Sequence, residues 1–319
     1  MIIKSRYKIK TESDLLFAKI DISNFLKKTK LEYISFFTFA LMELGTNILK
    51  YAKSGEIWLL EVDEVDNDYL LAALDEGGGI KNLDWAMKKG TSTKNSLGLG
   101  LYQLSNNSFF NISIFTSKKD PQGSVILIKP KNLNKDLIVL TQNYMDLDVS
   151  GDFFAKKGRY FILGDASGHG IKANKSAEFI KKYFLNNVIS CLFIDDFFKN
   201  LHQKLKDNHL RSAVISVGEI NKNKFNICGV GDINLISKID NKIEKKSFKE
   251  GIIGEAFSSS SKYSYNFSKN SNFFVFSDGI DEKMIYNITK QTDDIYLIVV
   301  CAVFYSKKND DKIILAIRT

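Results

Sequence analysis

Four short stretches that contain aspartate narrow down the possible folds of this 319-residue chain. They are SGD around Asp152, GDASGHG at residues 164–170, SDG around Asp278, and the pair Asp293–Asp294 ahead of IYLIVV. Each adjoins an apolar run with the length and composition of a buried β-strand. Carboxylates that converge from several strand ends form an octahedral oxygen site suited to Mg²⁺ or Mn²⁺. The alternative is that each aspartate only caps a turn, as Asp and Gly commonly do.

The glycines of GDASGHG raise a second interpretation, a loop that binds the phosphates of a nucleotide. A P-loop has the pattern G-x₄-G-K-[ST], and here Gly170 is not followed directly by a Lys and a Ser or Thr. We therefore interpret the glycines as a tight turn that presents Asp165 to a metal. Two such ions can clamp a phosphate and activate a water in line with it, so that no covalent nucleophile is needed.

A different kind of site is indicated in the first part of the chain. Glu43 and Asn47 lie four residues apart in ALMELGTNILKYA, and therefore on one face of a predicted helix. A carboxylate and an amide in this arrangement can deprotonate or orient a nucleophile and can bind Mg²⁺ through oxygen. Two polar surface positions of an amphipathic helix are the alternative.

Two glycine-rich segments follow that helix. LAALDEGGGI (71–80) is an apolar strand ending at Asp75, which can accept a hydrogen bond from an exocyclic amine, and glycines let a flat base approach the backbone. KKGTSTKNSLGLGLYQL (88–104) is a loop leading into a helix, where free N–H groups suit a triphosphate. One such segment is weak evidence, but the ordered set with the Glu-x₃-Asn helix is strong.

This ordered set resembles the GHKL ATPase fold, and more closely the RsbT-type serine kinases of bacterial partner-switching modules, over about residues 5–130. The resemblance implies that Glu43 is the general base, Asn47 a Mg²⁺ ligand and Asp75 the residue that holds the adenine of ATP. It implies further ATP-binding positions in the base pocket (Gly77, Gly79), in the phosphate-covering lid (Thr93, Gly98, Gly100) and near the adenine (Ser124, where the family usually has threonine). The alternative is a nucleotide-binding scaffold without catalysis.

The aspartate pattern resembles the SpoIIE-like, PPM-type, metal-dependent serine/threonine phosphatases, and in size the small RsbX-type members, over about residues 140–310. The resemblance implies that Mn²⁺ or Mg²⁺ is bound by four carboxylates and one backbone carbonyl, those of Asp152, Asp165, Asp278, Asp293 and Ala166. Asp165 would also be catalytic. Asp293 is preferred to Asp294 because the first aspartate of the motif aligns with the ligand of the family.

Two further positions bear on the phosphatase resemblance. Tyr296 replaces a usual threonine or serine, which removes no ligand. His169 is a candidate general acid, but it lies farther from Asp165 along the chain than the histidine of eukaryotic relatives.

The predicted fold class is α+β, with a GHKL (Bergerat) α/β sandwich in residues 1–130 followed by a PPM-type α-β-β-α sandwich in residues 131–319. A chain of this length exceeds the usual size of one hydrophobic core, and the polar segment PKNLNKD at 130–136 is the best boundary. The apolar run at 295–305 is too short to span a bilayer and is predicted to be a buried strand.

Together the two resemblances imply a bifunctional regulator that phosphorylates and dephosphorylates serine or threonine of a STAS-domain antagonist protein in a stressosome-like module. A sigma factor or another output protein is a further candidate partner. One alternative is an ATP-binding sensor or partner-sequestering domain that controls the phosphatase without kinase activity. Another is an ATP-regulated phosphatase of small molecules.

Charge and cysteine content limit the remaining classes of partner. The net charge of +8 comes from scattered lysines, without a basic helix or nucleic-acid-binding motif, so no nucleic-acid partner is predicted. The N-terminal MIIKSRYKIK lacks the apolar core of a signal peptide, and no membrane association is expected. Three widely spaced cysteines favour a reducing cytoplasm.

Overall fold

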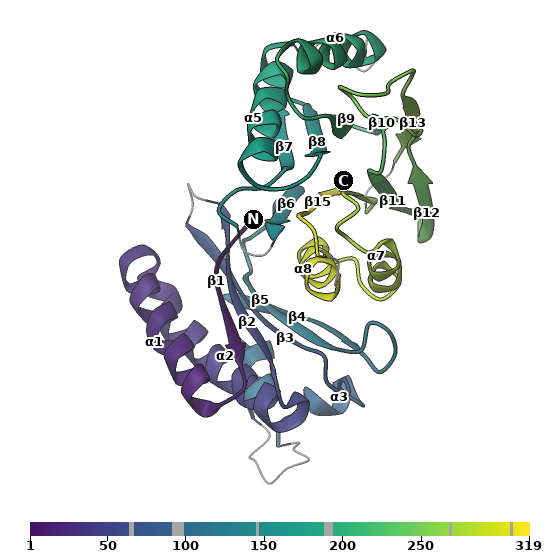
Figure 1. Ribbon diagram of the computed structural model, residues 1–319. Coiled ribbons are helices and arrows are strands. Elements are labelled where there is room, and N and C mark those ends of the chain that lie inside the picture. The colour runs from purple at the N-terminus through teal and green to yellow at the C-terminus, as the bar shows by residue number, and fades with distance from the viewer. Residues whose placement is uncertain (64–66, 91–98, 145–146, 188–193, 268–269, 307–308) are drawn as a thin grey trace. The chain divides into compact units, whose positions relative to one another are not determined.

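The computed structural model describes residues 1–63, 67–90, 99–144, 147–187, 194–267, 270–306 and 309–319 (Figure 1). Within these ranges the chain forms two compact units. The first consists of Met1–Lys135 and Tyr296–Phe304, and the second of Asp136–Ile295 and Tyr305–Thr319. None of the helices in the described ranges combines the length and the apolar character that a bilayer crossing requires.

The first unit is built on an antiparallel sheet of five strands in the described ranges, in the order β1-β2-β3-β5-β4. The strands are β1 (Ile2–Ile9), β2 (Gly55–Asp63), β3 (Asp68–Asp75), β4 (Phe110–Ser117) and β5 (Gly123–Pro130). The bounds of β3 confirm the strand predicted to end at Asp75.

Two helices, α1 (Glu12–Thr29) and α2 (Ile34–Asn47), share an apolar core with one face of this sheet. Helix α1 begins at a capping box, in which the Thr11 hydroxyl accepts from the Asp14 N–H and the Asp14 carboxylate accepts from the Thr11 N–H. The shorter helices of the unit are η1 (Leu31–Tyr33), the π-helical turn η2 (Ile48–Ala52), α3 (Leu83–Ala86) and α4 (Gly100–Ser105).

The run at 295–305 is helix α8 (Ile295–Tyr305), and the expectation of a strand there is wrong. Every residue from Ile295 to Val303 is at most 1% exposed, so the helix has no polar face and shows no 3.6-residue period. Length and composition alone do not separate such a run from a buried strand. Within the first unit, the Phe304 ring meets Trp58 edge-on at 5.9 Å between centroids. Trp58 alternates along β2 with residues that face α1 and α2, so this contact lies on the opposite face of the sheet.

The second unit contains two antiparallel sheets in its described residues, ordered β13-β10-β9-β8-β7 and β12-β11-β14-β15-β6. Their strands are β6 (Leu137–Gln142), β7 (Asp152–Lys157), β8 (Tyr160–Ala166), β9 (Ala213–Asn221), β10 (Lys224–Val230), β11 (Asn234–Ile239), β12 (Lys242–Ser247), β13 (Ser261–Asn266), β14 (Asn272–Phe276) and β15 (Lys312–Arg318). One apolar core, which includes Phe161, Phe225, Phe273 and Leu315, lies between the sheets.

Helices flank these two sheets. α5 (Gly170–Asn187) and α6 (Ile194–Asp207) pack with a second apolar core on the β7–β10 sheet, and α7 (Glu282–Thr289) contacts β11 of the other sheet. The unit is therefore a β-sandwich with helices outside it.

Candidate functional site

The candidate site of the second unit is formed where several strands begin or end. Asp152 is the first residue of β7, Asp165 lies next to the end of β8, and the two are direct cross-strand partners. Carboxylates placed opposite each other on neighbouring strands repel. This pair therefore needs a compensating charge or protons.

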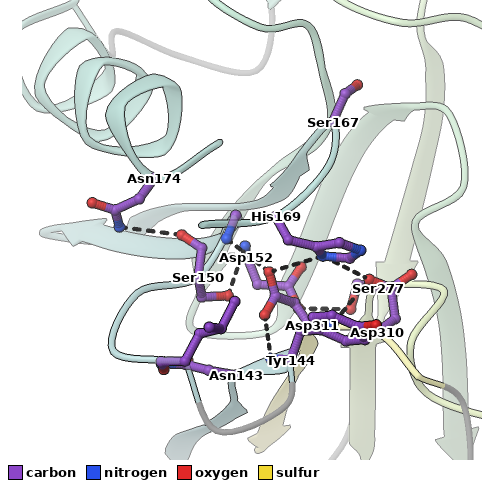
Figure 2. Close-up of polar contacts among 12 residues, drawn as sticks. Asn143, Tyr144, Ser150, Asp152, Ser167, His169, Asn174, Ser277, Asp310 and Asp311 are labelled. Atoms are coloured by element: carbon purple, nitrogen blue, oxygen red, sulfur yellow. Dashed lines mark hydrogen bonds and ion pairs between the residues drawn. The ribbon is translucent and has the colours of Figure 1, made fainter. Parts of the chain in front are cut away.

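Asp152 has one satisfied and one unsatisfied oxygen (Figure 2). Its Oδ2 accepts a hydrogen bond of 3.1 Å from the Ser277 hydroxyl, and its N–H donates to Ser150 Oγ at 3.0 Å. Its Oδ1 is buried and has no hydrogen-bond partner among the described residues, and the whole residue is 8% exposed. A buried charged oxygen without a partner is costly, so this oxygen needs either a proton or a cation.

Asp310 and Asp311, which precede β15, belong to the same group of carboxylates. Asp311 is 3% exposed, and its two oxygens accept hydrogen bonds from the backbone N–H groups of Tyr144 (2.6 Å) and Gly151 (2.8 Å). Asp310 Oδ1 accepts from the Asp311 N–H at 2.9 Å. Backbone donors thus fix the orientation of the Asp311 carboxylate beside the β7 strand.

Asp278 follows β14, the neighbour of β15 in the second sheet. The residue after it is glycine, and a Cβ at Gly279 would overlap the backbone carbonyl oxygen of Asp311. Only glycine therefore lets the SDG turn lie against the Asp310–Asp311 segment. The register of β14 and β15 brings these two aspartate stretches together.

Burial and mutual repulsion perturb these carboxylates strongly. Burial and then the charges of Asp278, Asp310 and Asp311 raise the pKa of Asp165 to about 8. Burial and then the charges of Asp165, Asp311 and Asp310 raise the pKa of Asp152 well above its ordinary value, against the effect of the Ser277 hydroxyl. An all-oxygen set that is short of positive charge fits a hard divalent cation. Among the described residues, no three His, Cys, Asp or Glu side chains lie close enough together to hold a metal ion. Repulsion between the carboxylates opposes a closer arrangement.

The structure does not bring Asp293, predicted as the fourth carboxylate, to the other three. Asp293 Oδ1 is paired with Lys238 Nζ at 2.6 Å, its side chain is 68% exposed, and it does not contribute to the raised pKa of Asp152 or Asp165. The N–H of Asp294 donates to Thr292 Oγ1. The pairs Asp293–Asp294 and Asp310–Asp311 each precede an apolar run. The run after Asp294 is helix α8, whereas the run after Asp311 is strand β15 of the sandwich. Only the strand brings its aspartates to the sheet edge where Asp278 lies.

His169 faces this group of carboxylates. Its Nδ1 lies 3.5 Å from Asp310 Oδ1 and 3.8 Å from Asp311 Oδ2, and its ring stacks on Tyr144 at 4.3 Å between centroids. The side chain is 38% exposed, so it is open to solvent on one side. Its role as a general acid stays a prediction, as does the ligation of a metal by the buried Ala166 carbonyl.

In the first unit, the structure brings the predicted residues together in two groups. Asp75 ends β3, pairs across the sheet with Ser124, and accepts a 2.7 Å hydrogen bond from the Gly77 N–H. Burial raises the pKa of Asp75, while the N–H groups of Gly77 and Ser124 oppose that rise. Ser124 Oγ lies 3.2 Å from Thr116 Oγ1, which accepts from the N–H of Ile80, the residue after Gly79.

The second group joins α2 to α4. Glu43 is partly buried on α2, and a Cβ at Gly100 would overlap its carboxylate, so Glu43 lies directly against the start of α4. Asn47 is the last residue of α2, one turn beyond Glu43. Thr93 and Gly98, predicted for the lid, lie outside the described residues.

Comparison with known proteins identifies a class of fold. No family model and no curated protein matches the chain. Solved structures that cover more than half of it are PPM-type serine/threonine phosphatases. RsbX in complex with magnesium is 21% identical, over 59% of this chain and 98% of that chain, with a TM-score of 0.50. At this identity the likeness concerns the fold.

Two further structures have lower TM-scores. One comes from a study of the bacterial stressosome, described there as a modular system adapted to control secondary messenger signaling. It is 20% identical over 58% of this chain and 100% of that chain, with a TM-score of 0.48. The other is the catalytic domain of the serine/threonine protein phosphatase PstP in complex with 2 manganese ions. It is 8% identical over 57% of this chain and 96% of that chain, with a TM-score of 0.43. Nucleotide binding by the first unit stays a prediction.

Proposed function

We propose that the second unit is a metal-dependent phosphatase of phosphoserine or phosphothreonine in proteins. The observation that carries this proposal is the buried Asp152, whose Oδ1 has no partner in the described structure and which lies among carboxylates that repel one another. The PPM fold shared with RsbX supports it. A turn-capping role would leave these aspartates on the surface with satisfied oxygens, and Asp152 does not fit that description.

Mg²⁺ or Mn²⁺ would be held by the carboxylates of Asp152, Asp165, Asp278 and Asp311 and by the Ala166 carbonyl. When bound, the ions supply charge for the phosphoryl oxygens and lower the pKa of a water. The protein's own contribution is orientation. The Ser277 hydroxyl holds Asp152, and the Tyr144 and Gly151 N–H groups hold Asp311, as partners of metal ligands commonly do.

His169 can complete the reaction by supplying a proton. Attack of water forms a new P–O bond and breaks the bond to the serine oxygen, which leaves as an alkoxide unless it is protonated. The ring of His169 faces the carboxylates on one side and solvent on the other. Asp310 Oδ1, 3.5 Å from its Nδ1, can orient the ring for this transfer.

For the first unit we propose ATP·Mg binding and phosphoryl transfer to serine or threonine of a STAS-domain protein. Glu43 lies against the start of α4, where it can act as a general base, and Asp75 forms a partly buried acceptor beside Gly77 for the adenine amine. The chain would then set the phosphorylation level of one partner with two opposed activities. The competing proposal is an ATP-binding sensor that sequesters a partner such as a sigma factor, although a pure binder has no need of Glu43.

Label transfer separates these two functions of the first unit. The full chain is incubated with γ-labelled ATP·Mg and a STAS-domain protein, as wild type, Glu43→Ala and Asp165→Asn. Kinase action predicts that Asp165→Asn increases the phosphorylated STAS protein and that Glu43→Ala abolishes it. Absence of label in every sample would favour the sensor.

Phosphate release tests the second unit independently. The purified phosphorylated STAS protein is mixed with the enzyme and Mn²⁺, and free phosphate is measured. Wild type and Asp293→Ala should release phosphate, whereas Asp165→Asn and Asp311→Ala should not. Loss of activity in Asp293→Ala as complete as in Asp311→Ala would overturn the assignment of the fourth carboxylate.

A further inference from the structure

Ile171 is the most exposed large hydrophobic side chain in the described ranges, at 81%. A single exposed apolar residue is common and needs no explanation by itself. Its position is what matters, because it is two residues after His169, whose ring faces Asp310 and Asp311. An apolar side chain is therefore displayed at the edge of the candidate phosphatase site.

The local structure holds Ile171 outward. Gly168 and Gly170 adopt φ values of +80° and +72°, which reverse the chain at the start of α5. The buried side of α5 carries Ala173, Ser176, Ala177, Ile180 and Phe184, so Ile171 and Lys175, four residues apart, lie on its outer side.

A hydrogen bond fixes this turn to the site. Asn174 Nδ2 donates to the Ser150 carbonyl at 3.1 Å, and Ser150 Oγ accepts from the N–H of Asp152 (Figure 2). The first turn of α5 is thus tied to the segment that carries Asp152. Ile171 is therefore held at a set position relative to that carboxylate.

The same turn is positively charged. Lys172 and Lys175 are exposed, neither is ion-paired within the described ranges, and the first turn of α5 has no acidic residue. Cations near a helix N-terminus oppose the helix dipole. These lysines do not stabilise their own helix, and their charge is available to an anionic partner.

We propose that Ile171, Lys172 and Lys175 form a docking surface for the residues that flank the phosphorylated serine or threonine of a protein substrate. Ile171 contacts an apolar side chain near the phosphorylated residue, and the lysines attract acidic residues in the same segment. The inference rests on the proposed phosphatase function and deepens it by naming the substrate class. A small phosphoester would gain nothing from this surface, because it does not extend beyond the phosphate.

The test compares two substrates in the presence of Mn²⁺. One is p-nitrophenyl phosphate. The other is an acidic phosphoserine peptide with leucine two residues after the phosphoserine, accompanied by a matched peptide with serine in place of that leucine. Steady-state kinetics are measured for the full-length wild type, Ile171→Ser and the double variant Lys172→Glu/Lys175→Glu. Leu185→Ser is the control, because Leu185 is a partly exposed leucine near the other end of α5.

Ile171→Ser should lower kcat/KM on the leucine peptide about tenfold, through KM, since one buried aliphatic contact is lost. It should change p-nitrophenyl phosphate hydrolysis less than twofold and should abolish the preference for leucine over serine. The lysine variant should lose activity on both acidic peptides and show a weaker salt dependence. Leu185→Ser should match wild type on every substrate.

Three outcomes would overturn the proposal in distinguishable ways. No hydrolysis of either substrate by wild type would refute the phosphatase function itself. Hydrolysis of p-nitrophenyl phosphate without hydrolysis of the peptides would leave a phosphatase but refute a protein substrate. Equal effects of Ile171→Ser on both substrates, or no effect on either, would refute the docking surface while leaving the phosphatase in place.

Discussion

Replacement of Asp165 by asparagine should stabilise the metal-free protein and abolish its response to divalent cations. Burial and the charges of Asp278, Asp310 and Asp311 raise the pKa of Asp165 from 3.8 to about 8. A carboxyl group with a raised folded-state pKa binds its proton more tightly in the folded chain than in the unfolded chain. Its ionisation therefore destabilises the fold, and this loss develops as the pH rises from about 4 to about 8. Asparagine has a similar shape and does not ionise.

The size of the effect follows from these two pKa values. An assay pH of 7 is about three units above the pKa of Asp165 in the unfolded chain. Each unit of difference between pH and pKa corresponds to about 1.36 kcal/mol. At pH 7 Asp165 is ionised in the unfolded chain but mostly protonated in the metal-free fold, and this difference costs the fold up to about 4 kcal/mol. The cost falls to about 2 kcal/mol at pH 5 and to less than about 1 kcal/mol at pH 4. The stabilisation by Asp165→Asn should follow this course.

Hydrogen exchange of the β7 and β8 amides measures this stability within the second unit, which matters in a chain of two compact units. Wild type, Asp165→Asn and the control Asp293→Asn are compared in EDTA at pH 5 and pH 7, and again with Mn²⁺. Mn²⁺ should protect wild type and Asp293→Asn but not Asp165→Asn. Equal protection of wild type and Asp165→Asn in EDTA at pH 7, or a gain that is as large at pH 5, would refute the electrostatic reasoning.

Three other substitutions test particular contacts. Gly279→Ala should weaken Mn²⁺ activation about 10–100-fold, because the new Cβ displaces the Asp311 segment. A titration of phosphatase turnover with Mn²⁺ measures this effect. An unchanged half-saturation concentration of Mn²⁺ would contradict the packing argument. Trp58→Ala should lower the free energy of unfolding, measured by thermal denaturation, by about 3–5 kcal/mol, since the ring is fully buried. The control Trp85→Ala, at a 40% exposed site, should lower it by under about 1 kcal/mol. Asp75→Asn should weaken the binding of a fluorescent ATP analogue about tenfold or more, because a charged hydrogen-bond acceptor is lost. Unaltered affinity would exclude Asp75 from the adenine site.

Apolar strand runs and the helix with two polar residues four positions apart could be predicted from the sequence. The helix that carries Glu43, the strand that ends at Asp75 and the strands next to Asp165 and Asp278 all occur close to their expected positions. A short apolar run bounded by turn residues is a local signal of a buried strand. The aspartates at these strand ends were therefore recognisable as candidates.

The identity of the last carboxylate could not be predicted in the same way. Two Asp-Asp pairs precede apolar runs, at 293–294 and at 310–311, and local composition does not distinguish them. The first run becomes α8 because it is buried on every side, and a helix satisfies its backbone hydrogen bonds without a neighbouring strand. The second becomes β15 because β14 and β6 pair with it.

The amino-acid sequence by itself determined which residues could act as ligands, since residue type and strand-end position are both local. Only the tertiary structure decided which of them meet. Asp152 and Asp311 are 159 positions apart in the chain, and the Gly151 N–H donates to Asp311 only because strands of two different sheets bring their ends to one edge of the sandwich. Charges that would repel in isolation are held together there by the hydrophobic core between the sheets.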